Sequence, residues 1–431
     1  MKILLLSNNP ISRTNSNGKT IGNLLSNFSK EEICNFFITD DNKDETHCTS
    51  FFAFSTKDVI KSFFTFKKIG NICQNQCESP SNVHLNNVNR GTFKKTAFKM
   101  LIRNMMYRRA VKQKSFTAWL AEQKIDIVIL QAGDLPFFYD LAVLISKKCN
   151  VPFMIYSTEE YPFKEYDYFK RKLHAGLFYN MFHNKLRKSA ARAYYHSTKS
   201  LFLTDDLKQL YIERFSLKNA ETIYNSYDVN LSSNDQVSSN DENLVITYCG
   251  NLDNKRWKGI VEIAAVINSI DRKFIIDVYG KCFDEDGIYE LRNNIAIRYH
   301  GFVAYDEYIK ITKSTDIILY TESNDFYSSI DLKYAFSTKI PDSLFTGKPF
   351  VCYLPKGLSS SKYLLENKCA YVSDNIEELG KQFRQIINSK HENKEMNIYK
   401  NNAILVSSLN HDPSKNSAKI EQLIRSITTK S

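Results

Sequence analysis

The chain has 431 residues, of which 43% are hydrophobic and 24% are charged. This composition is that of an ordinary globular protein and excludes collagen, coiled coils and intrinsically disordered chains. No apolar run approaches the roughly 18 residues that a membrane-spanning helix needs. The length exceeds what one hydrophobic core usually supports, so we expect two domains.

The N-terminus and the cysteines indicate the compartment. The opening MKILLLSNNP has too few apolar residues for a secretory signal peptide and is typical of a buried first strand. Nine cysteines are scattered, and the close pair Cys73 and Cys77 has no nearby histidine to complete a zinc site. We therefore expect reduced thiols, no metal and a cytoplasmic protein.

The charge is unevenly distributed. Residues 1–200 carry 30 Lys+Arg against 16 Asp+Glu, whereas residues 201–431 carry 28 against 31. The stretches 79–121 and 168–204 contain no acidic residue. Such a basic half predicts an anionic neighbour, either lipid or nucleic acid. No nucleic-acid-binding module is recognisable, so a nucleic-acid partner is not expected.

Apolar runs alternate with helical patterns along the whole chain, which predicts an α/β protein with parallel sheets. Expected strands are 2–7, 125–130, 151–157, 200–204, 244–250, 274–280, 295–301, 316–321 and 348–354. Expected helices include 93–114, 138–149, 205–215 and 259–270. The polar stretch 230–243 is the expected linker, so the domains are 1–229 and 244–395, followed by a helical segment 396–431 that is expected to return to the N-terminal domain.

In open parallel sheets, ligands bind beyond the carboxyl ends of the strands. Two such domains facing each other would enclose a cleft. The chain has neither G-x-G-x-x-G nor G-x-x-x-x-G-K-[ST], so the usual dinucleotide and P-loop motifs are absent. Phosphate binding at a helix N-terminus remains open.

The segment FSTKIPDSLFTGKPFVCY (336–353) carries the most specific pattern. Lys339 and Asp342 lie three residues apart at the start of an expected helix, and a strand follows it. A cation and a carboxylate placed so could hold a diphosphate and sugar or ribose hydroxyls. The alternative is a helix cap with solvent-exposed charges.

Two features of the N-terminal half are also candidates. Glu159 and Glu160 follow an expected strand and could orient an acceptor or assist its deprotonation; the alternative is a solvated acidic pair. The basic helix 93–114 places Phe98, Leu101, Ile102 and Met105 on one side, with lysines and arginines flanking them. This pattern is typical of an interfacial helix on anionic lipid, and equally of a helix packed on its own sheet.

The 336–353 block resembles the C-terminal domain of retaining GT-B glycosyltransferases of the family-4 type, whose pattern is T-K-hydrophobic-x-E-x-L-x-x-G-K-P. Further blocks look like this family in order, namely 193–228, 248–259, 277–282 and 299–323. The resemblance spans most of 193–385 and is weak between 30 and 120. It implies a GT-B-like fold of two Rossmann-like domains facing across a cleft.

The resemblance implies a donor site, residue by residue. Lys258 matches the family's phosphate lysine and Asp342 a ribose-binding glutamate, whereas Asn251 stands where an arginine is common. Tyr334 stands where a first glutamate is expected, which could move that contact to Glu322 or Asp331. The implied donor-binding residues are Gly18, Gly250, Asn251, Lys258, Gly280, Phe302, Val303, Glu322, Thr338, Lys339 and Asp342. For Gly18, a plain turn glycine is the alternative.

The implied activity is the transfer of a sugar from a nucleotide-diphosphate sugar to a glycan or lipid-linked glycan, with retention of configuration. Such a hexosyltransferase would need no cofactor or metal and would serve bacterial surface polysaccharide synthesis. Helix 93–114 would hold it peripherally on the inner face of the cytoplasmic membrane. The alternatives are a nucleotide-sugar epimerase or hydrolase of the same fold, and an inactive relative that only binds nucleotide sugar.

Overall fold

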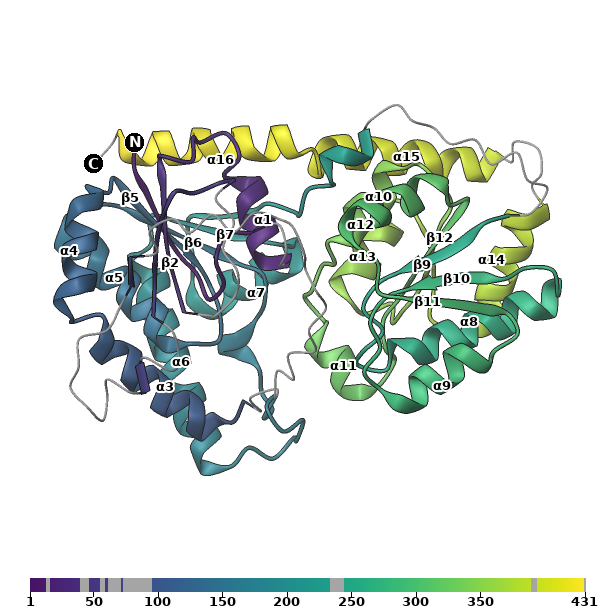
Figure 1. Ribbon diagram of the computed structural model, residues 1–431, viewed down its shortest axis with the longest axis horizontal. Coiled ribbons are helices and arrows are strands. Elements are labelled where there is room, and N and C mark those ends of the chain that lie inside the picture. Colours follow the sequence, from purple (N-terminus) through teal and green to yellow (C-terminus); the bar gives the residue numbers. More distant parts are fainter. Residues whose placement is uncertain are drawn as a thin grey trace. The chain divides into compact units, whose positions relative to one another are not determined.

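The structure is a computed structural model that describes residues 1–12, 16–38, 46–54, 59–60, 71–72, 95–232, 244–388 and 394–429. Cys73, Cys77, Lys94 and most of the expected linker 230–243 lie outside these residues. The chain forms two compact units. The first comprises Met1–Leu203, Leu207–Thr222 and Ser417–Ser431, and the second Thr204–Asp206 and Ile223–Asn416 (Figure 1).

The first unit is built on a sheet with the strand order β4-β3-β2-β1-β5-β6-β7-β8. Its strands are β1 Ile3–Leu6, β2 Ile33–Phe37, β3 Ser50–Ala53, β4 Asn71–Ile72, β5 Ile127–Gln131, β6 Phe153–Ser157, β7 Lys199–Phe202 and β8 Ala220–Thr222. All pair in parallel except β4, which runs antiparallel at one edge. Every residue of β1, β2, β5 and β6 is buried, as expected for a parallel sheet covered on both faces.

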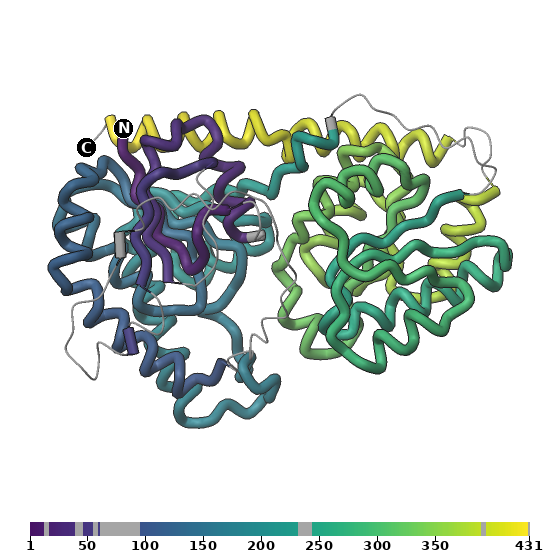
Figure 2. The backbone as a smooth tube through the Cα atoms, in the orientation of Figure 1, coloured from purple at the N-terminus to yellow at the C-terminus, as the bar shows by residue number. Residues whose placement is uncertain are grey.

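The helices of the first unit follow its strands. They are α1 Ser16–Leu24, α3 Ala97–Ala110, α4 Lys114–Gln123, α5 Pro136–Cys149, α6 Leu177–His196, α7 Asp205–Phe215 and the C-terminal α16 Pro413–Thr428. Helices α3, α5 and α6 pack against one another. The C-terminal helix lies against the start of the chain, since Ser417 Oγ accepts a hydrogen bond from the Asn27 backbone N–H at 2.9 Å (Figure 2).

Among the described residues, a helix is present within the expected range 93–114, but it is shorter than expected. Helix α3 begins after Thr96, whose side chain caps it, and it ends at Ala110. A turn then separates it from α4, because the backbone of Gln113 is extended. On α3, Ala97, Met100 and Tyr107 are buried, whereas Phe98, Ile102 and Met105, which the sequence grouped on one side, are exposed together.

The second unit contains a sheet with the order β11-β10-β9-β12-β13-β14, and all its strand pairs are parallel. The strands are β9 Ile246–Cys249, β10 Ile276–Tyr279, β11 Ile297–Gly301, β12 Ile317–Thr321, β13 Phe350–Tyr353 and β14 Tyr371–Ser373. Strand order reverses between β9 and β12, because β10 and β11 extend one way and β13 and β14 the other. Such a switch point opens a crevice at the carboxyl ends of the two central strands.

Helices cover this second sheet. They are α8 Arg256–Ile270, α9 Glu285–Asn293, α10 Tyr305–Ser314, α11 Phe326–Asp331, α12 Lys339–Phe345, α13 Ser359–Glu366, α14 Ile376–Asn388 and α15 Lys394–Asn410. The apolar face of α8, including Ile260, Ile263 and Ile267, is fully buried against the strands. The predicted α/β class, with two Rossmann-like parallel sheets, is therefore confirmed. Among the described residues, no helix combines the length and apolar character that crossing a bilayer requires.

Candidate functional site

The backbone at the carboxyl ends of β9 and β10 is tightly packed. Gly280, directly after β10, has a φ of +155°, a conformation that side chains rarely adopt. A Cβ at Gly280 would lie only 1.7 Å from the carbonyl oxygen of Gly250, which follows β9. Glycine at position 280 therefore lets the backbone segments that follow β9 and β10 approach each other this closely.

A charged network spans the switch point itself. Arg256, the first residue of α8, donates from Nε to Glu322 Oε2 at 2.5 Å, and the Tyr320 hydroxyl donates to Glu322 Oε1 at 2.6 Å. The Glu322 side chain is 7% exposed and follows β12 directly. Gly259 lets α8 pack this closely, because a Cβ there would lie 2.2 Å from Thr321 Oγ1.

The network is electrostatically coupled. Burial disfavours the charged guanidinium of Arg256, but Glu322 outweighs it and raises the pKa of Arg256. Burial and the neighbouring Glu322 also raise the pKa of Tyr320 well above its ordinary range. Arg256 thus stays cationic and Tyr320 stays a hydrogen-bond donor, with the arginine held at the crevice.

Lys339, at the start of α12, lines a cavity of about 20 Å³ beside this network, together with Cys249, Tyr308 and Tyr320. Among the described residues, no carboxylate forms an ion pair with its amine. Burial lowers the pKa of Lys339, and Arg256 lowers it further. The cavity is of a size for one water molecule, so any larger anion would bind at its rim. An anion bound next to Lys339 would therefore stabilise the charged form of this lysine.

Lys258 lies on a different side of α8 from Arg256. Residues two apart on a helix do not share a face. The Lys258 amine stacks over the Trp257 ring at 5.4 Å and contributes to the lowered pKa of Asp284, whose main cause is the hydrogen bond from Trp257. The sequence assigned the phosphate-binding role to Lys258 and not to Arg256. The two-residue spacing did indicate that only one of these two side chains could face the crevice.

Asp342 is committed to protein partners. Its Oδ1 accepts from the Asp228 backbone N–H at 2.7 Å and its Oδ2 from the Tyr308 hydroxyl at 2.8 Å. The residue is 4% exposed. The alternative of a solvent-exposed helix carboxylate is therefore wrong for Asp342.

The remaining donor-binding candidates of the second unit lie around the same rim. Phe302 follows β11 and is 62% exposed, with the Lys281 amine 4.3 Å from its ring centroid. Val303 is half-buried beside it, and Asn251, after Gly250, is exposed. Thr338 precedes α12 without capping it through its side chain. An exposed ring next to a cation could stack a nucleotide base.

Gly18 and the paired glutamates belong to the first unit. Gly18 lies in the first turn of α1, not in the expected loop, because the helix begins at Ser16.

Glu160 is buried and its Oε1 pairs with Lys164 at 3.2 Å, so a solvated acidic pair is wrong for this residue. Burial raises the pKa of Glu160 to about 7, although Lys164 opposes the shift. Within the part of the chain that the structure describes, its Oε2 has no hydrogen-bond partner. Glu159, half-buried, accepts through its carbonyl from Tyr211.

Comparison with solved structures identifies the architecture. HepE from Anabaena, crystallised with UDP, aligns over 99% of this chain and 100% of its own with a TM-score of 0.64 and 12% identity. The chain has the GT-B fold. Sucrose-phosphate synthase from Thermosynechococcus elongatus covers 100% of both chains with a TM-score of 0.63 and 10% identity. WaaG, a glycosyltransferase of lipopolysaccharide biosynthesis, covers 97% of this chain and 99% of its own with a TM-score of 0.56 and 12% identity.

These GT-B neighbours are glycosyltransferases, and HepE has also been crystallised with UDP-glucose, at a TM-score of 0.61 and 14% identity. No protein-family model matches the chain, and no curated protein matches it. Identities this low establish the fold alone. Within the described residues, no group of three or more His, Cys, Asp or Glu side chains could hold a metal ion.

Proposed function

We propose that this protein is a retaining, metal-independent glycosyltransferase that moves a sugar from a nucleotide-diphosphate sugar to a glycan or lipid-linked glycan in bacterial surface polysaccharide synthesis. The observation that carries the proposal is the Lys339 amine, which has no ion pair among the described residues and lies beside the Arg256–Glu322 pair at the switch point of the second sheet. GT-B neighbours crystallised with UDP and UDP-glucose support it.

The donor would bind at the rim of the second unit. Lys339 and Arg256 would neutralise the diphosphate as it leaves, which is the main electrostatic task of the reaction. Gly250 and Gly280 would let its oxygens approach the backbone, and Phe302 with Val303 would contact the base. Asn251 and Thr338 complete the proposed donor site of the second unit, whereas Lys258 lies on the other side of α8.

The carboxylates Glu159 and Glu160 would serve the acceptor. A pKa of about 7 suits Glu160 to accept a proton from a sugar hydroxyl near neutral pH. Its buried Oε2, which has no hydrogen-bond partner among the described residues, would be the acceptor atom for that hydroxyl.

We further propose that the protein lies peripherally on the cytoplasmic membrane through α3. Three apolar side chains lie on the exposed side of α3: Phe98 is 51% exposed, Ile102 37% and Met105 49%. Apolar side chains flanked by lysine and arginine are typical of helices that lie in the headgroup region of anionic bilayers.

A ligand screen tests the donor assignment. We expect one nucleoside diphosphate among UDP, GDP, dTDP and ADP to raise the melting temperature, since a ligand at 100 times its dissociation constant stabilises a protein by about 2.7 kcal/mol. Lys339→Gln should markedly reduce the shift, whereas Lys310→Gln, on the exposed face of α10, should retain it. No shift with any nucleotide would overturn the proposal.

Product analysis tests the reaction. With the stabilising nucleotide sugar and a cell-envelope extract as acceptor, we expect a glycan product whose anomeric configuration equals that of the donor. Release of free sugar without an acceptor would instead identify a hydrolase, and a changed donor sugar an epimerase. Nucleotide binding without any turnover would identify an inactive relative.

A further inference from the structure

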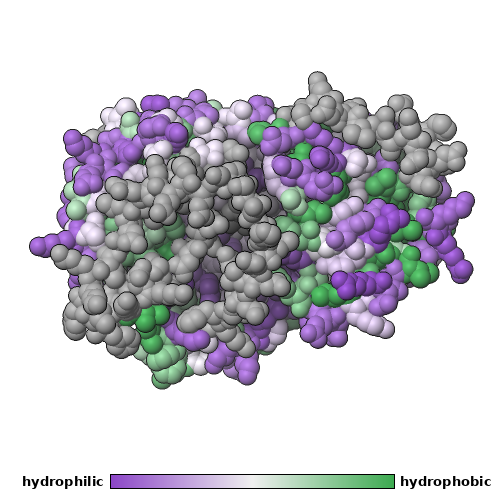
Figure 3. All heavy atoms as spheres, viewed as in Figure 1, coloured by the Kyte–Doolittle hydropathy of each residue, from purple (hydrophilic) through white to green (hydrophobic). Residues whose placement is uncertain are grey.

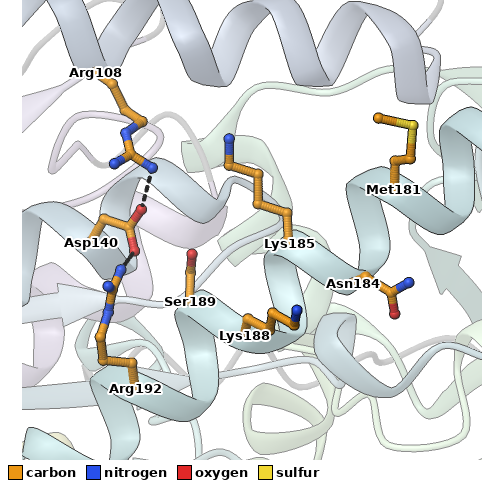
Figure 4. Close-up of a pocket in the computed structure, with 8 residues that line it drawn as sticks. All are labelled: Arg108, Asp140, Met181, Asn184, Lys185, Lys188, Ser189 and Arg192. Atoms are coloured by element: carbon orange, nitrogen blue, oxygen red, sulfur yellow. Dashed lines mark hydrogen bonds and ion pairs between the residues drawn. The ribbon is translucent and has the colours of Figure 1, made fainter.

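The first unit contains a pocket of about 390 Å³, lined mostly by charged residues, between α3, α5 and α6. Arg108 comes from α3, Asp140 from α5, and Lys185, Lys188 and Arg192 from α6. Figure 4 shows both arginines directed at Asp140 and the Lys185 amine extending toward the helix that carries Arg108.

Positive charge exceeds negative charge in this pocket. Asp140 accepts from Arg108 Nη1 at 2.9 Å and also from Arg192, so one carboxylate is shared by two guanidinium groups. Among the described residues, neither Lys185 nor Lys188 forms an ion pair with a carboxylate. Burial lowers the pKa of Lys185, and the nearby Arg108 lowers it further. An anion in the pocket would relieve this repulsion.

An exposed apolar patch adjoins the pocket. It consists of Phe98, Ile102 and Met105 from α3 and Leu177, Phe178 and Met181 from α6, which are between 37% and 73% exposed. The rings of Phe98 and Phe178 touch at a centroid distance of 5.2 Å, so the two helices present one surface. Figure 3 shows hydrophobic atoms at the edge of the first unit where Figure 1 labels α3 and α6. Met181 belongs to both the patch and the pocket.

The spacing on both helices makes this a continuous stripe. On α3, positions 98, 102, 105 and 108 follow steps of three and four residues, and on α6 so do positions 178, 181, 185, 188 and 192. Such positions lie on one helix face. On each helix the stripe changes from apolar to cationic side chains, and Lys185 lies four residues, about 6 Å along the helix axis, beyond Met181.

We propose that the pocket between α3, α5 and α6 binds the phosphate of an anionic lipid headgroup while the apolar patch enters the acyl boundary. In a bilayer leaflet, the phosphates lie a few ångströms from the apolar acyl chains. The stripe has the matching order, because its cationic side chains lie next to its apolar ones. This inference deepens the membrane contact of the proposed function and rests on it; it does not depend on donor binding.

Vesicle binding tests the pocket. Wild-type protein should sediment with phosphatidylcholine vesicles that contain phosphatidylglycerol and much less with phosphatidylcholine alone. Lys185→Gln combined with Lys188→Gln should weaken binding by about 30-fold, the loss expected for two basic residues at the surface. The matched control is Lys30→Gln with Lys124→Gln, two exposed lysines that precede β2 and β5, which removes the same charge away from the pocket and should change binding less than threefold.

A further variant and a phosphate titration distinguish the pocket from the apolar patch and from a soluble ligand. Leu177→Ser should also weaken vesicle binding, and because this side chain is 73% exposed, the melting temperature should change little. Equal losses in the two lysine pairs would overturn the pocket and leave the membrane contact standing. No binding of wild type would overturn both. A melting shift with inorganic phosphate that depends on Lys185 and Lys188, without vesicle binding, would identify a soluble phosphate ligand and overturn the lipid. The nucleotide screen of the donor site is unaffected by any of these results.

Discussion

Arg256 and Glu322 form an ion pair, with 2.5 Å between Nε and Oε2, that joins the first residue of α8 to the end of β12. Their side chains are 16% and 7% exposed. Because the two strands β9 and β12 meet here at the switch point, this pair fixes the local geometry of the proposed donor site. It also fixes where a cation is available to a diphosphate.

Breaking this pair should be costly. Arg256→Ala leaves Glu322 buried without its charge partner, and we expect the free energy of unfolding to fall by about 3–5 kcal/mol. Urea denaturation measures this loss. The exposed pair of Lys310 and Glu307 is the control, and Lys310→Ala should cost less than about 1 kcal/mol. Similar losses for the two variants would contradict the structural role of the buried pair.

Lys339→Gln should separate binding from stability. Removing a charge-assisted contact to a phosphate weakens binding by about 1.5–3 kcal/mol. Stability should not fall, since the lysine has no ion pair among the described residues and burial lowers its pKa. Calorimetric titration with the nucleotide found in the screen measures the affinity. Lys258→Ala is the comparison: its side chain is exposed over Trp257, so we expect a smaller loss of affinity. The reverse order would move the diphosphate to the Lys258 side of α8.

Glu160 should give the protein a distinctive pH dependence. Its pKa is raised from 4.5 to about 7, so the folded state holds a proton that the unfolded state has lost. The free energy of unfolding should therefore decline as the pH rises from about 4.5 to about 7, by at most about 1.4 kcal/mol for each pH unit. Urea denaturation across this range should show that slope in wild type and not in Glu160→Gln. Identical slopes would contradict the raised pKa.

The same titration should appear in catalysis. A general base works only when deprotonated, so kcat/KM should rise with pH through about 7 in wild type. In Glu160→Gln the rate should be low and independent of pH in this range. A rise that survives the substitution would assign the base to another group.

Gly280 should tolerate no side chain. Gly280→Ala brings a Cβ to 1.7 Å from the Gly250 carbonyl oxygen at a φ of +155°, so both sterics and backbone strain oppose it. Gly357→Ala is the control, since nothing lies within 4 Å of its Cβ position. We expect the melting temperature to drop sharply for the first variant and to stay nearly constant for the second. At Gly301, φ is +77° and no described atom lies within 4 Å of the Cβ position. The melting temperature of Gly301→Ala therefore measures the cost of backbone strain without a steric clash.

The sequence predicted the fold class because the strands that cross the buried middle of each sheet read as continuous apolar runs, as in the ILLL of β1 and the IILYT of β12. It did not identify β2 or β3, which lie in the region of weak resemblance. It placed the end of α3 too late because Lys112 and Lys114 continue the basic pattern past the turn. The partners of Arg256 and Asp342 could not be predicted for a different reason. Glu322 lies 66 residues from Arg256, and Asp228 lies 114 residues from Asp342, so no local sequence pattern encodes either contact.

Asp342 binds two donors at once, since its two oxygens accept from the Asp228 N–H and the Tyr308 O–H. Asp342→Asn can satisfy one of these donors at most, because its amide nitrogen cannot accept a hydrogen bond. Asp342→Ala satisfies neither, and each lost hydrogen bond to a charged group costs about 1.5–3 kcal/mol. Tyr308→Phe removes one bond alone and should match the smaller of these losses.

Donor affinity measured on the same variants decides what Asp342 does. With both oxygens occupied and 4% of the residue exposed, we expect unfolding to become easier in the order Tyr308→Phe, Asp342→Asn, Asp342→Ala while nucleotide affinity changes little. Asp342→Glu should also destabilise, since a buried site filled by aspartate has no room for another methylene. If affinity instead falls with each Asp342 variant and survives in Tyr308→Phe, the carboxylate exchanges its protein partners for the ribose hydroxyls when the donor binds. That outcome would return Asp342 to the ribose-binding role that its motif predicts.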